Sequence, residues 1–335
     1  MGPLTRLAIF LLALLTISAA QAADVSLMVG GIEKQIYLPA VLAQQLGYFR
    51  DEGLDVELLS EPAGVEAADE MLAGAVQGVV GFYDHTIELQ SLGKYTESVV
   101  QFGQAPGEVE VVSTKHPEIR SVADFKGKRI GVTGLGSSTD FLTEYLLAKA
   151  GLRFSDVTPV PVGAGDTLIS AMRHDQIQAA MTTEPTVSRL LLTGEASILV
   201  DARTLAGSRA VFGGTYPAGC LYMETVWVET HRAIVQKLVN AMVRTMHFIA
   251  THNADQIAAK MPSDFYTGDP PLYVSALAHG MEMFTRDGRM PPDGPATVLS
   301  VLSQIRGNLK NKTIDLSKTY TSEFVDKANA ASPLP

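Results

Sequence analysis

The sequence predicts an α/β fold with two similar lobes, on three observations. Short apolar runs typical of buried strands alternate with segments whose apolar residues recur at helical spacing, which is the signature of a layered α/β architecture. The length of 335 residues, with 46% hydrophobic and 19% charged positions, is sufficient for about two domains. The alternation also occurs twice, with a displacement of 101 residues that pairs Met71 with Met172, Gln77 with Gln178, and Tyr83 with Glu184. This repeat favours two similar lobes over a single continuous sheet.

The N-terminus has the order of a secretory signal peptide. Arg6 precedes an apolar stretch over residues 7–17, and the small-residue sequence Ala19-Ala20-Gln21-Ala22-Ala23 follows it. The apolar stretch is shorter than the roughly 20 residues that span a bilayer, and no later apolar run reaches that length. We therefore expect a signal peptide over residues 1–22, cleaved near Ala22, and a soluble mature protein in a bacterial periplasm.

In the first lobe the expected elements alternate as strand, helix, strand, helix, strand. Strands are predicted over residues 25–29, 54–59 and 78–82. The helix between the first two carries apolar residues at helical spacing from Leu38 to Phe49, with Pro39 in its first turn, where the missing N–H is not needed. Residues 47–53 are expected to turn the chain into the second strand. A second amphipathic helix is predicted over residues 65–76.

The second lobe repeats this order from residue 121. A strand over residues 129–132 leads through a glycine-rich loop into an amphipathic helix that Gly151 closes, and another strand is expected over residues 197–200. An apolar segment over residues 211–227 precedes a long helix with an apolar face from Ile234 to Ile249. A last helix follows the break at Pro291-Pro292.

Composition excludes several classes of function. Lys and Arg number 26 against 36 Asp and Glu, giving a net charge of −10, and no basic patch suited to a phosphate backbone is present, so we expect no nucleic-acid partner. The single cysteine, Cys220, excludes an internal disulfide and a cysteine-rich metal site. Neither the H-E-x-x-H nor the G-x-S-x-G pattern occurs, so we expect no enzymatic activity, no catalytic residue, no cofactor and no metal.

One candidate binding loop contains Gly136, Ser137, Ser138 and Thr139, between the strand at 129–132 and the next helix. The start of a helix exposes unpaired backbone N–H groups, which favour anions and hydrogen-bond acceptors. The alternative is that one of the hydroxyl groups only caps the helix. The sequence does not decide between them.

A second group of candidates follows the third strand of each repeat. Tyr83, Asp84 and His85 form the loop after the strand at 78–82, where open α/β sheets bind ligands. Glu184 holds the matching place in the second repeat, and Tyr216 lies in a glycine-rich loop. The alternatives are that Asp84 caps a helix over residues 86–92, that Tyr83 packs at the sheet edge, that His85 is merely solvated, and that the loop of Tyr216 is a structural turn.

Three sequence segments, taken in order, resemble one known family. They are Tyr37-Leu38-Pro39-Ala40, then Gly47-Tyr48-Phe49 leading to Glu52-Gly53-Leu54-Asp55-Val56-Glu57, and finally Asp124 with Lys126-Gly127-Lys128 and Ile130-Gly131-Val132. Over residues 24–250 the chain resembles the solute-binding proteins of ABC importers for nitrate, sulfonates, taurine and thiamine-pyrimidine precursors. Some eukaryotic members are enzymes that use a cysteine-rich segment and a histidine, and the lone Cys220 departs from that pattern.

The resemblance implies a two-lobed periplasmic binding protein of type II, with a small-molecule ligand in the cleft between the lobes and an inner-membrane permease as partner. Lobe one would comprise residues 24–110 and 218–335, and lobe two residues 111–217. It implies a monomer, and it implies cleft contacts from Gly31, Tyr37, Tyr83, Asp84, His85, Gly136, Ser137, Ser138, Thr139, Glu184 and Tyr216. The alternatives are an exported enzyme of the pyrimidine-synthesis type and a ligand sensor. The ligand is open between a flat heteroaromatic ring stacked on tyrosines and a small anion.

Overall fold

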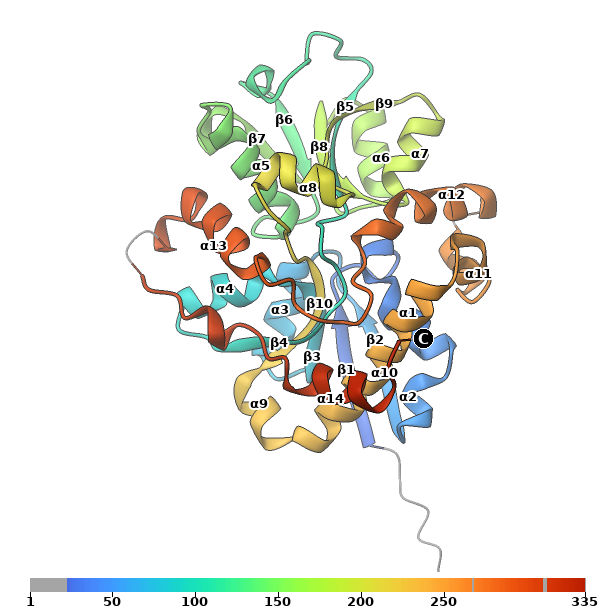
Figure 1. Cartoon of the computed structure of the whole chain (residues 1–335). Helices are drawn as coiled ribbons and strands as arrows, with labels where there is room; N and C mark the ends of the chain where they lie inside the picture. Colours follow the sequence, from blue (N-terminus) through green and yellow to red (C-terminus); the bar gives the residue numbers. More distant parts are fainter. Residues whose placement is uncertain (1–22, 267, 310–311, 335) are drawn as a thin grey trace, which may run out of the picture.

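The computed structural model describes residues 23–266, 268–309 and 312–334 of the chain (Figure 1). The expected signal peptide, residues 1–22, lies outside the described residues. Two five-stranded sheets form the centres of two lobes, one above the other in Figure 1, with helices around them. The expected two-lobed α/β fold is therefore confirmed. No helix among the described residues combines the length and the apolar character needed to cross a membrane.

Lobe one, the lower lobe of Figure 1, is built on a sheet of strand order β2-β1-β3-β10-β4. Its strands are β1 (Ala23–Val29), β2 (Leu54–Ser60), β3 (Gly78–Phe82), β4 (Thr96–Gln101) and β10 (Gly219–Glu224). Its helices are α1 (Leu38–Gln45), α2 (Tyr48–Asp51), α3 (Gly64–Leu72), α4 (Asp84–Ser91), α9 (Thr225–Thr230), α10 (Arg232–Thr251), α11 (Ala254–Ala258), α12 (Pro270–Gly280), α13 (Gly294–Ile305) and α14 (Glu323–Ala331). Gly47 adopts φ +76° and separates α1 from α2, at the start of the turn expected over residues 47–53, and α2 forms a short helix within that turn.

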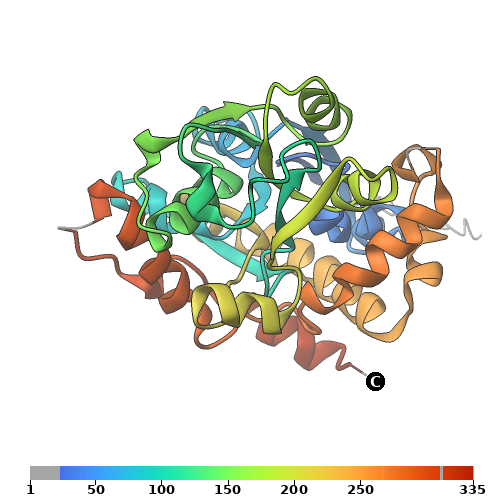
Figure 2. The same cartoon turned by 90° about the horizontal axis from the view of Figure 1, so that it is seen from above.

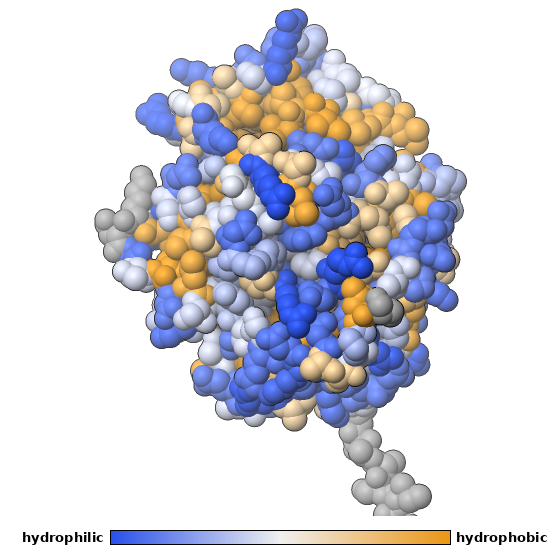
Figure 3. Space-filling model, in the orientation of Figure 1, coloured by the Kyte–Doolittle hydropathy of each residue, from blue (hydrophilic) through white to orange (hydrophobic). Residues whose placement is uncertain are grey.

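Lobe two has the equivalent strand order β7-β6-β8-β5-β9. Its strands are β5 (Glu108–Ser113), β6 (Arg129–Val132), β7 (Thr158–Pro161), β8 (Ala179–Thr183) and β9 (Ala196–Asp201), and its helices are α5 (Ser138–Lys149), α6 (Asp166–Arg173), α7 (Thr186–Leu192) and α8 (Leu205–Phe212). Seen from above, helices surround the strands of this lobe (Figure 2). In the view of Figure 3, hydrophobic residues gather over this lobe, and the surface below is mostly hydrophilic.

The repeat in the sequence corresponds to a repeated strand junction. In lobe one, Gln77 exchanges two hydrogen bonds with Ser26: its backbone N–H donates to the Ser26 carbonyl (3.0 Å), and its Oε1 accepts from the Ser26 N–H (2.7 Å). In lobe two, Gln178 makes the same two bonds with Arg129, each at 2.9 Å. Each glutamine thus fixes the third parallel strand beside the first.

The chain crosses between the lobes twice, and each crossing delivers an antiparallel strand. Strand β5 enters lobe two and pairs antiparallel with β8 and β9, whereas β10 returns to lobe one and pairs antiparallel with β3 and β4. The crossing segments are bonded side by side, because the Ala218 N–H donates to the Gly103 carbonyl (3.0 Å). Residues 108–110, which the expected boundary assigns to lobe one, pair within the second sheet. Two segments joined in this way have the form of a hinge.

The lobes also contact one another away from the hinge. Helix α13 packs against α5, and α12 packs against α7. One apolar cluster contains side chains of α3 and β3 together with Phe141, Leu142 and Tyr145 of α5. The structure is therefore a closed arrangement of the lobes.

Candidate functional site

A small cavity lies between the lobes, at the carboxyl ends of the parallel strands of both sheets. Its lining residues are Lys34, Ile36, Tyr37, Gly64, Glu108, Thr133, Ser137, Ser138, Thr139 and Thr183. Its volume is about 10 Å³, counted as the space available to the centre of a water molecule. The cavity therefore has room for one water molecule. A larger solute can enter only if the lobes separate.

The loop before α5 places a cluster of hydroxyl groups against this cavity. The oxygen atoms of Thr133, Ser137 and Thr139 lie 2.8 to 3.0 Å from one another. Ser137 Oγ also donates to the Gly134 carbonyl (2.7 Å), and its side chain makes no capping bond to α5. This geometry does not support the alternative in which Ser137 only caps the helix. The first-turn N–H groups of α5 therefore remain uncapped by Ser137, beside a cavity that Ser138 also lines.

Two glycines allow the backbone turns on either side of the cavity. Gly136, at φ +82°, turns the chain into α5, and its N–H donates to Asp140 Oδ2 (2.8 Å). Gly31, at φ +107°, follows β1, and a Cβ atom there would lie 2.4 Å from Cε of Lys34. Gly31 thus leaves the space in which the Lys34 side chain lies.

Asp84 is a junction between the lobes. It was expected in a loop, but it is the first residue of α4, and no side chain caps that helix. Ser138 Oγ donates to Asp84 Oδ1 (2.9 Å), and the Tyr216 hydroxyl group donates to Oδ2 (3.1 Å). The side chain is fully buried, and burial raises the pKa of Asp84 to about 7, although these two hydrogen bonds oppose the shift.

The aromatic candidates lie near the cavity, but only Tyr37 lines it. The Tyr83 hydroxyl group bonds Thr319 and its ring packs edge-on against Tyr320, within lobe one. Tyr216 is fully buried and packs on Phe212 with ring centres 4.8 Å apart. In this closed arrangement each of the two rings packs against other side chains of the protein.

His85 is buried rather than solvated. Its ring lies between Phe141 of α5 and Tyr222 of β10, with centres 5.9 and 6.5 Å away. Burial lowers the pKa of His85 to about 4, so its imidazole is neutral at pH 7. Its Nε2 would lie 2.8 Å from a Cβ atom at Gly64, so that glycine provides the space for the ring.

Glu184 belongs to a structural ion pair. Its Oε1 lies 2.6 Å from Nη1 of Arg203, and both side chains are at least nine-tenths buried. Ser188 donates its backbone N–H and its hydroxyl group to the same carboxylate at 2.9 and 3.0 Å. The backbone of Glu184 reaches lobe one, because its carbonyl oxygen accepts a hydrogen bond from the Gln35 N–H (3.0 Å).

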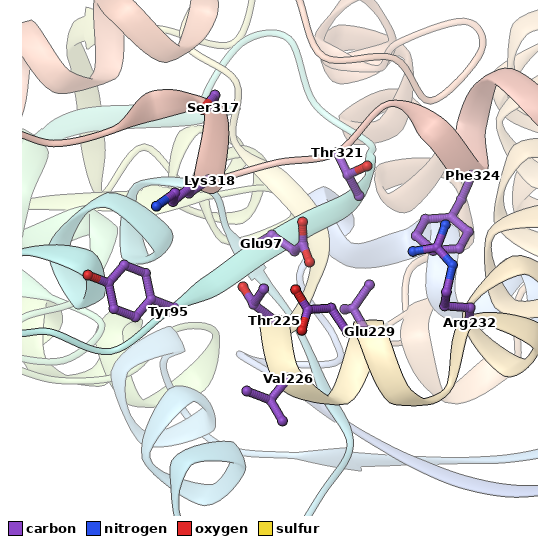
Figure 4. Close-up of a pocket in the computed structure, with 11 residues that line it drawn as sticks. Tyr95, Glu97, Thr225, Val226, Glu229, Arg232, Ser317, Lys318, Thr321 and Phe324 are labelled. Atoms are coloured by element: carbon purple, nitrogen blue, oxygen red, sulfur yellow. The ribbon is translucent and has the colours of Figure 1, made fainter.

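A larger hollow lies elsewhere, on the surface of lobe one between β4, α9 and the segment before α14 (Figure 4). Its volume is about 530 Å³. Glu97 and Glu229 point into it side by side, and Arg232 lies over the ring of Phe324 with its guanidinium carbon 5.1 Å from the ring centre. This hollow involves only one lobe, so opening and closing of the lobes would not reshape it.

Comparison with known proteins identifies the family. The family model described as NMT1/THI5 like matches residues 36–255, which is more than half of the chain. The chain belongs to the NMT1/THI5-like family. A structure of a protein from Bordetella bronchiseptica RB50 is 38% identical, with a TM-score of 0.90 over 93% of this chain and 99% of that one.

Two further relatives of this NMT1/THI5-like protein are more distant. A putative binding protein of Brucella abortus is 23% identical over 84% of this chain and 87% of the relative. The structure of the alkanesulfonate-binding protein SsuA from Xanthomonas axonopodis pv. citri bound to MOPS is 20% identical, with a TM-score of 0.72 over 90% of this chain and 99% of that one. The second likeness shows the periplasmic binding protein fold.

Lys34 also lines the cavity of this NMT1/THI5-like protein, together with Glu108, Thr133 and Thr183, of which the last three were not among the expected contacts. Lys34 donates from Nζ to the carbonyl oxygens of Gly30 (2.6 Å) and Pro62 (2.8 Å), and burial lowers the pKa of Lys34 to about 8. Glu108 is 1% exposed at the start of β5. Thr133 and Thr183 end the two neighbouring strands. The glutamates at positions 108 and 110 of an otherwise mostly apolar strand were a possible signal, but the sequence does not show which of them faces the cavity.

Proposed function

We propose that this protein is the solute-binding subunit of an ABC import system. It captures a small solute between its lobes in the periplasm and delivers it to a permease in the inner membrane. The observation that carries this proposal is the interlobe cavity, on which polar groups of both lobes converge. The names of the Brucella and Xanthomonas relatives support it.

Binding would proceed by hinge closure. The crossing segments at Gly103 and Ala218 allow the lobes to separate, and a solute entering the cleft would bridge them. The uncapped N–H groups at the start of α5 suit an acceptor group of the solute, and the nearby Lys34 ammonium group favours the same end. Closure would then restore the Ser138 to Asp84 bond.

The site serves binding rather than catalysis in this proposal. Among the described residues that line the cavity there is no cysteine or histidine. Cys220 is buried in β10, where burial raises the pKa of its thiol, so it holds no reactive thiolate. The protein would act as a monomer without a cofactor.

The test is a thermal-shift screen of residues 23–335, followed by calorimetric titration of each hit. The panel is nitrate, bicarbonate, taurine, alkyl and aryl sulfonates, aromatic carboxylates and aminopyrimidines. A solute at a hundredfold excess over its Kd stabilises the native state by about 2.7 kcal/mol. Thr183→Val should weaken binding, whereas the matched Thr182→Val should not, because Thr183 lines the cavity and its neighbour on β8 does not. Equal effects of the two substitutions would place the binding site elsewhere.

A further inference from the structure

Glu108 holds the one carboxyl group that lines the interlobe cavity. It is the first residue of β5, directly opposite Thr183 of β8, and it is 1% exposed. Within the described part of the chain its carboxyl group has no hydrogen-bond partner, and its Oε2 is fully buried. An acceptor that is removed from water and left unpaired is costly, and native structures contain few of them.

Several other polar groups at or beside the cavity already have partners. Asp84 accepts from Ser138 and Tyr216, and the three hydroxyl groups before α5 bond one another. Lys34 gives two of its donors to backbone carbonyl oxygens, and no salt bridge joins it to Glu108 in the described structure. Among the described residues that line the cavity, the Glu108 carboxyl group is therefore a buried acceptor that no neighbouring side chain satisfies.

We infer that the solute carries an N–H donor, as an ammonium, amidinium or amino group, and donates it to Glu108 when the lobes close. This inference rests on the proposed solute-binding function and names the ligand class for the same cavity. A donor would complete the hydrogen bonding of Glu108, and a cationic donor would in addition favour the ionised form of its carboxyl group. Solutes that only accept, such as nitrate or a plain alkanesulfonate, would leave Glu108 unpaired.

In a rival arrangement the hydrogen bond between Glu108 and the solute runs in the opposite direction. Burial and the nearby Asp84 raise the pKa of Glu108, so its carboxyl group can carry a proton while the cavity holds no cation. A protonated Glu108 could donate to an acceptor on the solute. Glu108→Gln separates the two cases, because the amide has a permanent N–H donor, keeps only one acceptor oxygen and carries no negative charge.

The experiment compares matched solutes that differ by one amino group. The pairs are taurine with ethanesulfonate, β-alanine with propionate, and 4-amino-2-methylpyrimidine with 2-methylpyrimidine, titrated against residues 23–335. The control variant is Glu110→Gln, because Glu110 lies two residues along β5, is fully buried with both oxygens unpaired, and does not line the cavity. We expect an amino member to bind at least about tenfold more tightly than its partner, and Glu108→Gln, but not Glu110→Gln, to remove that difference.

Each result has a defined meaning. If solutes bind but the amino group makes no difference, or Glu108→Gln keeps it, the inference is overturned and the proposed function stands. If no probe binds, the proposed function loses its support, and the melting temperature of unliganded Glu108→Gln decides the role of this residue. A melting temperature at or above that of the wild type supports the inference, because it shows that the Glu108 carboxyl group has no stabilising partner in the fold. A melting temperature lower by several degrees shows that Glu108 stabilises the fold, and it overturns the inference.

Discussion

Ser138 at the start of α5 donates a 2.9 Å hydrogen bond to Asp84 at the start of α4, and this bond joins helices of different lobes. The hydroxyl group and the carboxylate are both buried. Tyr216, from the second crossing segment, bonds the other carboxylate oxygen. Asp84 therefore connects both lobes and the hinge, and its environment should respond when the lobes move.

Ser138→Ala should loosen the closed arrangement without unfolding either lobe. The substitution removes the interlobe bond and leaves Tyr216 on Asp84. One such hydrogen bond contributes about 1 kcal/mol, so we expect roughly fivefold weaker binding of any solute hit. Calorimetric titration measures this, with Ser170→Ala on the exposed face of α6 as the matched control. Equal affinities for the two variants would show that the bond does not hold the closed state.

Asp84→Asn should flatten the pH dependence of stability. Because the pKa of Asp84 is about 7 in the folded state against 3.8 in the unfolded chain, the folded state binds one more proton between these values. Stability therefore falls as pH rises from about 4 to 7, by up to about 1.4 kcal/mol per pH unit from this group. His85, with a folded pKa of about 4, opposes this trend over much of the same range and is unchanged in the variant. Urea unfolding at pH 4.5 and pH 7 measures the difference, and an unchanged slope in the variant would contradict the account.

Glu184→Ala should destabilise the fold rather than act through the ligand. Removing one partner of a buried ion pair leaves Arg203 without part of its compensation and typically costs about 3 to 5 kcal/mol. Arg173→Ala, which breaks the exposed pair with Glu195 in the same lobe, should cost less than about 1 kcal/mol. Chemical unfolding of both variants tests this. If Glu184→Ala unfolded like wild type and lost only solute binding, Glu184 would be a ligand contact after all.

Much of the fold could be predicted because local signals and tertiary structure agree. Strands β3 and β6 have the bounds expected from their apolar runs, and Gln77 and Gln178 hold the same place in both lobes. The short helix α2 was not predicted, because residues 47–53 were expected only as a turn that Gly47 begins. With four residues, α2 is too short for its apolar spacing to distinguish a helix from a turn.

The site was harder to predict because it depends on partners that are distant in the sequence. Glu184 has an acidic side chain at the expected strand end, but this carboxylate accepts a hydrogen bond from Arg203, 19 residues later in the sequence. Tyr83 lies at the right strand, yet its hydroxyl group is held by Thr319 near the C-terminus. Glu108 lines the cavity because β5 crosses to the other lobe, and no local pattern shows that crossing.

The most direct test of the central claim is fluorescence energy transfer between the lobes. Leu192 on α7 and Val226 on α9 are 68% and 71% exposed, so each can be replaced by a labelled cysteine, while the native Cys220 is buried. A control pair at Leu92 and Val226 keeps both labels in lobe one. We predict that a solute hit shifts the transfer efficiency of the interlobe pair and leaves the control pair unchanged. Binding of the solute without a shift in the interlobe pair would contradict capture by closure of the lobes.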